Sequence, residues 1–471
     1  METSLENKYL IEEKISKLFL KFSIPCVTGL LIGSFYNIID QIFIGNSELG
    51  YLGNAATGVS FPLICIANAC AWSVGDGSAA FLSICAGQKD STSAHKCVGS
   101  CITLTLIISI VLVILGHAFA EPLLRIFGAS DQTIGMAVEY FRIVVSFFPF
   151  YLLVNVTGAM IRADGSPNYS MIATLIGAII NIALDPLFIF VFKWGIAGAA
   201  WATVIAQVIS CIACLAYFRH PKTFKLDKQS FIPDKAISLR TVTLGISTFI
   251  TQISLVVITL ICNMTLFHYG ELSAYGPDIP ISVFSIETKV YTIVINVIVG
   301  FSLGGQPIFG YNYGAGKIDR VRKAYSLCLI SSLTVSLIAT LIFQLWPQAV
   351  IRMFGPGNAL YMEFAVKTFR IFLLLLCSSA MMKLTTIFFQ AIGKPAQAIV
   401  AALARDIISF APLALLLPYF LEKANAGTGI YGLLYAGPIA DAISLVVITC
   451  ITVPFFKNLR KIEREASESN K

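Results

Sequence analysis

Long apolar runs, separated by short charged or Gly/Pro-containing breaks, occupy almost the whole chain. About 20 apolar residues, each rising 1.5 Å in a helix, cover the hydrocarbon core of a bilayer, and these runs are at least that long. The pattern predicts twelve membrane-spanning helices with limits near residues 18–44, 52–84, 97–119, 134–160, 167–192, 195–218, 241–268, 279–310, 324–346, 359–389, 395–421 and 428–456. We therefore expect an all-α polytopic membrane protein.

The composition supports the membrane class, since 57% of the 471 residues are hydrophobic, 13% are charged and the mean hydropathy is +0.81. No cleavable signal pattern precedes the first run, so that run is expected to direct insertion itself. The twelve cysteines lie mostly inside the runs and show neither a disulfide framework nor metal-ligand spacing.

Lysine and arginine gather in alternate loops, and this asymmetry predicts the orientation of the chain. Of the 33 basic residues, the loops expected outside hold Arg125, Lys193, Arg352 and Lys423. Under the positive-inside rule both termini are therefore predicted to be cytoplasmic. The same asymmetry accounts for the formal net charge of +7 without a nucleic-acid partner. We interpret the basic loop 219–240 as a topology anchor beside anionic lipid.

The two halves of the chain repeat one another. Leu123–Gly128 recurs as Val350–Gly355, and Gly165-Ser166-Pro167 recurs as Gly393-Lys394-Pro395, at a nearly constant separation. Six spans per copy is an even number, so both copies enter the membrane in the same sense and form a parallel repeat of two six-helix lobes. We predict an N-lobe at 1–218, an inter-lobe loop at 219–240, a C-lobe at 241–456 and a cytoplasmic tail at 457–471. Rocking of the lobes would give alternating access.

Two acidic residues stand alone in long apolar runs. Asp40 is the one acidic or basic residue between Phe22 and Ile44, and Asp185 is the one between Asn168 and Phe192. A carboxylate at membrane depth costs about 2.5–3.5 kcal/mol on insertion scales, so such groups usually face a functional cavity. Both lie roughly 27–28 Å along their helices from the inner boundary, at 1.5 Å per residue. We therefore expect them to lie level and to share one site.

Other polar residues are placed to join this site. Asn181 precedes Asp185 by one helical turn and Tyr36 precedes Asp40 in the same way, while Thr203 is predicted to lie at a similar depth. As a hard-oxygen cluster the group could hold Na⁺ at Asp40, Asn181 and Asp185. As a desolvated acid pair it could trap a proton, which removes the repulsion between like charges. The alternative is a buried polar cluster with a purely structural role, which only holds helices together.

Two prolines are candidate bends beside these carboxylates. Pro186 follows Asp185 and is expected to break the helical ladder and to free a backbone carbonyl. Pro25 lies in the first span, where it could let the helix straighten or kink as Asp40 changes protonation state.

The second half lacks the same acidic pair, because Leu413 stands opposite Asp185 when Pro167 is aligned with Pro395. We predict that Glu287 is a cation-attracting carboxylate facing the substrate cleft, against the alternative of a structural role. Arg405–Asp406 is interpreted as a structural pair between helices, against the alternative of a substrate ligand, and the sequence assigns no role to Asp76 or Asp441. Aromatic residues near Asn155 would suit flat lipophilic cations, and this substrate-cleft set is Phe147, Phe148 and Tyr151.

Taken together, the chain resembles the multidrug and toxic compound extrusion (MATE) family, within it the MepA-type bacterial branch. The residues that carry the resemblance are Pro25, Tyr36-x-x-x-Asp40, Ala86-Gly87, Arg162-Ala163-Asp164-Gly165, Asn181-x-x-x-Asp185-Pro186, Gly304-Gly305-Gln306-Pro307 and Ala315-Gly316. The resemblance implies two six-helix lobes in a V shape. It also implies an N-lobe cation-coupling site at Asp40, Asn181, Asp185 and Thr203, with Tyr36 and Asn155 beside it. A second-lobe cation site in spans seven and ten is not expected, since those spans offer Gln252 and no carboxylate beyond Glu363.

The sequence is compatible with three function classes to different degrees. The first is a multidrug efflux transporter in the bacterial inner membrane that exports lipophilic organic cations, including antibiotics and other xenobiotics, by antiport with Na⁺ or H⁺. The second is a flippase for a lipid-linked or polysaccharide precursor, which would want basic residues in its cleft. The third, an enzyme, is disfavoured because His95, His117, His220 and His268 form no metal or nucleophile arrangement. Neither a cofactor nor an obligate protein partner is predicted; the expected partners are drug-like organic cations and the lipid bilayer.

Overall fold

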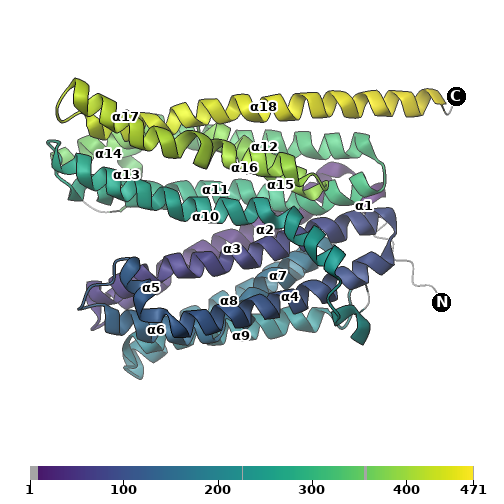
Figure 1. The fold of residues 1–471 in the computed structure, drawn as a ribbon, viewed down its shortest axis with the longest axis horizontal. Coiled ribbons are helices and arrows are strands. Elements are labelled where there is room, and N and C mark those ends of the chain that lie inside the picture. The colour runs from purple at the N-terminus through teal and green to yellow at the C-terminus, as the bar shows by residue number, and fades with distance from the viewer. Residues whose placement is uncertain (1–8, 225, 355–357, 470–471) are drawn as a thin grey trace. The chain divides into compact units, whose positions relative to one another are not determined.

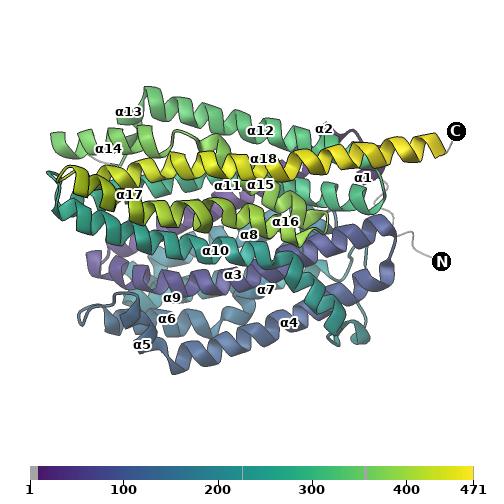
Figure 2. The same cartoon turned by 45° about the horizontal axis from the view of Figure 1, so that its top comes forward.

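The computed structural model describes residues 9–224, 226–354 and 358–469, and every regular element in these ranges is helical (Figure 1, Figure 2). The elements, in chain order, are α1 (Tyr9–Glu12), α2 (Ile15–Gly45), α3 (Gly50–Gln88), α4 (Ser91–Ala118), α5 (Ala120–Ile126), α6 (Ile134–Ser146), α7 (Phe148–Ala163), α8 (Pro167–Pro186), η1 (Leu187–Val191), α9 (Gly195–Tyr217), η2 (Lys228–Phe231), α10 (Lys235–Glu271), α11 (Asp278–Gly314), α12 (Ile318–Leu345), α13 (Pro347–Arg352), α14 (Ala359–Phe372), α15 (Leu376–Ala391), α16 (Pro395–Leu403), η3 (Ala404–Phe410), α17 (Ala411–Ala424) and α18 (Gly429–Ser469). The elements η1 and η3 are π-helical, and η2 is a 3₁₀ helix.

The spans predicted from hydropathy match these helices. Within the described ranges, 10 helical stretches are long and apolar enough to cross a membrane, and two bent pairs raise the number to 12. The pairs are α6 with α7, bent by 54°, and α14 with α15, bent by 49°. The prediction of an all-α protein with twelve spans is thus confirmed, whereas the fourth and tenth spans are bent where the sequence predicted continuous runs.

The order of elements repeats, as the sequence motifs predicted. In each half a long helix (α4 or α12) leads into a short one (α5 or α13) and then into a bent pair. A π-helical segment follows in the fifth span of each half, as η1 and as η3. The final helix, α18, continues to Ser469 through residues predicted as a tail.

Only the first bend has a local cause in the sequence. Pro149 is the second residue of α7, and a proline there has no N–H to offer the preceding turn and clashes with it. The break between α14 and α15, at residues 373–375, contains neither proline nor glycine. There the buried Phe372 packs edge-on against Phe284 and Phe410, with ring centroids 6.2 and 5.7 Å away, so tertiary packing accompanies this bend.

The chain forms two compact units, each with its own apolar core. Unit 1 comprises Met1–Gln252, Leu303–Lys317 and Gln390–Pro395, and unit 2 comprises Ile253–Ser302, Ile318–Phe389 and Ala396–Lys471. Unit 1 therefore includes the first part of α10, the last part of α11 and the connection before α16. Phe141 and Leu152 belong to the core of unit 1, and Phe364, Phe369 and Phe410 to that of unit 2. In unit 2, α17 and α18 run side by side (Figure 1, Figure 2).

The predicted inter-lobe loop is fastened to α4 inside unit 1. Thr103 Oγ1 donates to the Phe231 carbonyl at 2.8 Å, and the Asp234 amide donates to Ser100 Oγ at 3.1 Å. A Cβ added at Gly99 would lie 2.0 Å from the Ser230 carbonyl oxygen, so glycine lets η2 lie directly on α4. The loop is therefore held along much of its described length.

Asp164 anchors the start of the same loop. Its carboxylate is fully buried and accepts hydrogen bonds from the Tyr217 hydroxyl at 2.6 Å, the Lys222 amide at 2.8 Å and the Thr223 amide at 2.7 Å. The Thr223 hydroxyl donates to it as well. Lys222 Nζ also reaches the neighbouring Gly165 carbonyl at 3.0 Å. One buried acceptor thus ties the end of α9 and the following loop to the α7–α8 connection.

We predict that Asp164→Ala releases this loop. Each buried donor left without an acceptor costs about 1–3 kcal/mol. The bound conformation of the loop would therefore be only slightly more stable than the released one. Limited trypsin digestion should cleave after Arg219 and Lys222 many times faster in the variant than in the parent protein. Asp131→Ala, a change at a carboxylate that is 93% exposed, is the control and should leave the digestion pattern unchanged. Equal cleavage of both variants would refute the anchoring role.

Candidate functional site

Asp40 on α2 and Asp185 on α8 meet inside unit 1. The two helices pack against each other, and the two carboxyl groups interact electrostatically, as expected from their equal predicted depth. Asp40 is 8% exposed and Asp185 is fully buried. Two like charges this close in an apolar setting repel strongly, so the pair is stable only when a proton or a cation compensates them. We refer to Asp40 and Asp185 as the carboxylate pair.

Several oxygens of the carboxylate pair and of the neighbouring Asn181 have no hydrogen-bond donor. Asn181 Nδ2 faces Asp185 Oδ1 at 3.4 Å and Thr203 Oγ1 at 3.5 Å, both long hydrogen bonds. Asp40 Oδ1, Asp185 Oδ2 and Asn181 Oδ1 are buried and have no hydrogen-bond partner. Because buried polar atoms are nearly always satisfied, three such oxygens in one place indicate a site that takes a positive species. Oxygen-only ligands suit a hard cation or a proton.

The helix carrying Asp185 changes its geometry next to the site. α8 ends at Pro186 and continues as the π-helical segment η1, in which the Phe192 amide donates to the Leu187 carbonyl at 2.9 Å. The expected break in the α-helical ladder is therefore present, and π-helical segments often mark functional sites. Pro25, in contrast, is buried within α2, and the helix runs across it without a break.

Two further residues of the predicted cation-coupling set lie near the pair in different ways. Tyr36 stands one turn before Asp40 and interacts electrostatically with both carboxylates. The Asn155 amide is committed elsewhere: it accepts from Trp72 Nε1 at 2.9 Å and donates to the Tyr151 carbonyl at 2.9 Å. Asn155 therefore joins α7 to α3, and these two hydrogen bonds do not involve the carboxylate pair.

The sequence reasoning missed several polar residues beside this site. Tyr140 on α6 is buried and interacts electrostatically with Asp40, Asp185 and Tyr36. On α3, Asn68 accepts from the Tyr151 hydroxyl, one turn away from the Trp72–Asn155 bond. A signal was available, since Asn68, Trp72 and Asp76 follow one another at four-residue spacing within an apolar run. We call the contact made by Asn68 and Trp72 with Tyr151 and Asn155 the α3–α7 seam.

The predicted aromatic residues differ in how accessible they are. Phe147 is half-buried at the break between α6 and α7, with its ring edge-on to Trp201 at 5.6 Å. Phe148 is buried in the core of unit 1, against Phe141 at 6.5 Å and Tyr151 at 6.2 Å. The Phe148 ring thus offers almost no surface to a substrate in this structure, whereas Phe147 and Tyr151 keep some exposure.

Glu287 in unit 2 is an isolated buried carboxylate. It lies on α11, is 2% exposed, and its Oε1 has no hydrogen-bond partner. The positive charge of Arg405 acts on Glu287 and also on Cys262 of α10. An unsatisfied buried acceptor of this kind is the feature expected of a group that meets a cationic ligand.

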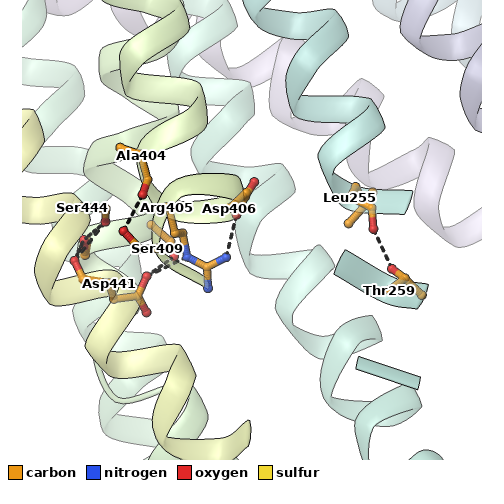
Figure 3. Close-up of polar contacts among 10 residues, drawn as sticks. Leu255, Thr259, Ala404, Arg405, Asp406, Ser409, Asp441 and Ser444 are labelled. Carbon is orange, nitrogen blue, oxygen red and sulfur yellow. Dashed lines mark hydrogen bonds and ion pairs between the residues drawn. The ribbon is translucent and has the colours of Figure 1, made fainter. Parts of the chain in front are cut away.

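The Arg405 cluster is the largest buried ionic group among the described residues of unit 2 (Figure 3). Arg405 Nε donates to Asp441 Oδ1 at 2.7 Å, and Arg405 Nη1 donates to Asp406 Oδ1 at 3.0 Å. Ser379 Oγ donates to Asp441 Oδ1 at 3.1 Å. The interpretation of Arg405–Asp406 as a pair between helices is wrong, because both residues belong to η3. The partner on another helix is Asp441 of α18, a residue to which the sequence assigned no role.

No group of three or more His, Cys, Asp or Glu side chains able to hold a metal ion occurs within the described part of the chain. The oxygen cluster around the carboxylate pair contains two carboxylates, and its other oxygens belong to the Asn181 amide and the Thr203 hydroxyl. It therefore remains a candidate for a monovalent cation or a proton.

Comparison with known proteins gives matches along most of the chain. The MatE family model matches residues 25–187 and 248–416. The multidrug export protein MepA of Staphylococcus haemolyticus (strain JCSC1435) is 25% identical over 438 residues, which is 92% of each chain. MepA of Staphylococcus aureus (strain MSSA476) is 25% identical over 338 residues, covering 69% of this chain and 73% of that protein. A solved structure described as the outward-facing conformation of a multidrug resistance MATE family transporter of the MOP superfamily has a TM-score of 0.87 at 21% identity, covering 98% of this chain and 99% of that one.

Proposed function

The chain belongs to the MATE family of multi-pass membrane transporters and is not an enzyme, and from this premise we propose that it exports lipophilic organic cations in exchange for Na⁺ or H⁺. The observation that carries the proposal is the carboxylate pair with its unpartnered oxygens. Such a site binds one small cation or proton at a time, which is what an antiporter needs in order to couple a gradient to export.

The relatives support a substrate class and a location for the protein. The similar staphylococcal proteins are described as multidrug export proteins, which supports drug-like substrates for this chain and a role in antibiotic resistance. Those relatives are bacterial, and the long apolar helices require a bilayer, so we place the protein in the bacterial cell membrane. We propose in addition that the chain forms two six-helix lobes and that both termini are cytoplasmic.

In this mechanism the positive species changes the charge state of the carboxylate pair. When Na⁺ or H⁺ enters, the repulsion between Asp40 and Asp185 is removed, and α2 can pack more closely against α8. When it leaves, the pair repels and α2 is pushed away, with Pro25 as the point where that helix lacks a backbone hydrogen bond. Binding therefore biases the chain between two arrangements, which is the requirement for alternating access.

Whole-cell efflux tests this function. In bacteria lacking their own efflux pumps, expression of the protein should lower ethidium accumulation and raise resistance to ethidium and other lipophilic cations. Collapse of the membrane ion gradients with an ionophore should restore accumulation. Unchanged accumulation in cells shown to contain the protein in their membranes would contradict the proposal.

Glu287→Gln tests the predicted contact with substrate. Removal of the negative charge should narrow the range of cations exported and raise their apparent KM, while neutral substrates are still carried. Resistance profiles measured for a panel of cationic and neutral compounds give the readout. Glu363→Gln, on an exposed carboxylate of the same unit, is the control and should leave the profile unchanged. A wild-type profile for Glu287→Gln would assign that residue a structural role.

A further inference from the structure

Asp76 is a point on α3 where three other segments of unit 1 converge. Thr248 Oγ1 of α10 lies 3.2 Å from Asp76 Oδ2, placed to donate to it, and Gln306 Nε2 of α11 donates to the Asp76 backbone carbonyl at 3.2 Å. Gln390 Nε2 of α15 donates to Thr248 Oγ1 at 3.2 Å. We call these four residues the Asp76 cluster. All of them belong to unit 1.

Backbones touch directly on both sides of the Asp76 cluster. A Cβ added at Gly77 would lie 2.1 Å from the Thr241 carbonyl oxygen, and one added at Gly245 would lie 1.7 Å from the Ser73 carbonyl oxygen. Glycine is thus required at both positions for α10 to reach α3. Surfaces without interdigitated side chains can part with little rearrangement, so the side-chain bonds of the Asp76 cluster become important for holding them together. The predicted topology places these ends of α3 and α10 toward the cytoplasm.

Polar side chains on α2, α7 and α3, some of them in contact and some spaced by one helical turn, extend from the carboxylate pair toward Asp76. Tyr36, beside the pair, interacts electrostatically with Tyr151, which is the first residue of the α3–α7 seam. Along α3, Asp76 follows the seam residues Asn68 and Trp72 at one-turn spacing. At its end the positive charge of Arg162 on α7 acts on the Asp76 carboxylate.

We propose that Asp76 is a second station for the coupling ion, which accepts the proton or Na⁺ that leaves the carboxylate pair and thereby releases α10 from α3. This inference rests on the antiport function proposed above and deepens it. For a proton, the O–H bond on the pair breaks and a new O–H bond forms on Asp76, which becomes neutral. The carboxylate pair gains one negative charge as it loses the proton, so the total charge is unchanged.

The Thr248 hydroxyl supplies the physical link between the ion and the helix contact. Its single hydrogen has two acceptors within reach, Asp76 Oδ2 at 3.2 Å and Gln390 Oε1 at 3.4 Å. An ionised carboxylate is the stronger acceptor, because charge-assisted hydrogen bonds are roughly twice as strong as neutral ones. Once Asp76 is neutral, Gln390 Oε1 competes for the hydrogen, so the bond from α10 to α3 is weakened while the existing contact between α10 and α15 is strengthened. Arrival of the ion therefore favours opening on the cytoplasmic side, where the ion is released.

The chain carries its own reporter of this opening. Cys97 on α4 is fully buried, and its Sγ lies 4.0 Å from both the Ser78 carbonyl oxygen of α3 and Thr241 Oγ1 of α10. Its alkylation by N-ethylmaleimide, quantified by mass spectrometry of the protein in liposomes, should report separation of α10 from α3. Cys211 is also fully buried, lies on α9, and serves as the internal reference.

We expect Asp76→Asn and Thr248→Val each to raise the ratio of Cys97 to Cys211 alkylation several-fold and to slow ethidium efflux. Asn mimics the neutral carboxylate, and Val removes the hydrogen that binds α10 to α3 without changing any charge. The matched control is Thr251→Val, since the Thr251 hydroxyl donates to the Ser247 carbonyl of its own helix at 2.9 Å. That variant should label and transport like the wild type.

Efflux measured in the same liposomes separates the two proposals. If both variants export ethidium at the wild-type rate and show unchanged Cys97 labelling, the proposed role of Asp76 is overturned, while the antiport function stands. Equal labelling increases in Thr248→Val and Thr251→Val overturn it as well, because the effect would then be one of helix stability. Absence of wild-type efflux under either gradient overturns the antiport function, and the role of Asp76 with it.

Discussion

Asp185→Asn is expected to reduce gradient-driven efflux of ethidium to the rate of protein-free liposomes, while the folded protein remains in the membrane. Asn has nearly the same shape as Asp but cannot bind a proton or offer a negative charge to Na⁺. It also removes the repulsion that distinguishes the loaded from the empty state of the pair. Asp40→Asn is expected to have the same effect, because both carboxylates are needed for that repulsion. The readout is the initial efflux rate per mole of reconstituted protein.

The control is Asp131→Asn, the same chemical change at an exposed carboxylate that pairs with Arg125. It should transport at the wild-type rate. Retained transport in both Asp40→Asn and Asp185→Asn would remove the assignment of coupling to this site. Loss in one variant alone would move the coupling role to that single carboxylate.

Asp441→Leu is expected to cause the largest loss of stability among the substitutions considered. Asp441 is 2% exposed and accepts from both Arg405 and Ser379, so its removal leaves much of a buried guanidinium charge uncompensated. Breaking a buried ion pair in this way typically costs about 3–5 kcal/mol. The melting temperature in detergent should fall accordingly, and the yield of folded protein with it.

A double substitution separates the ion pair from simple packing. Arg405→Leu together with Asp441→Leu should recover part of the lost stability, since the replacement of a whole buried pair by apolar residues is often close to neutral. In the double variant Asp406 has lost Arg405 but still interacts electrostatically with the positive charge of Lys383. Asp319→Leu breaks the surface pairs of Asp319 with Arg322 and Lys323 and should cost less than about 1 kcal/mol. A melting temperature for Asp441→Leu equal to that of the wild type would contradict the role of the Arg405 cluster.

The positions of the spans and of the carboxylate pair could be predicted because both depend on properties that are local in the sequence. A span needs about 20 apolar residues, and depth follows from counting residues along a helix. Asp40 and Asp185 could therefore be brought together without knowledge of tertiary contacts. The four-residue spacing of Asn181 and Asp185 likewise predicts that their side chains share one helix face. In the structure Asn181 Nδ2 lies 3.4 Å from Asp185 Oδ1.

The features that escaped prediction depend on contacts between distant parts of the chain. Arg405 and Asp441 are 36 residues apart on different helices, so the sequence pattern points to the adjacent Asp406 and not to Asp441. Asp76 meets Thr248 and Gln306 at separations of 172 and 230 residues, which no local pattern reveals. The bend at Phe147 was foreseeable from Pro149, whereas the bend after Phe372 lies in a run of leucines and reflects packing.

Reconstituted transport with separate gradients tests the central claim most directly. Ethidium efflux from proteoliposomes would be followed with a Na⁺ gradient alone and then with a pH gradient alone. We predict that at least one of the two gradients drives ethidium against its own concentration gradient, and that the effective gradient identifies the coupling ion. If neither gradient moves ethidium although folded protein is present in the liposomes, the drug-antiport function is contradicted, and transport of a lipid-linked or polysaccharide precursor becomes the function to test.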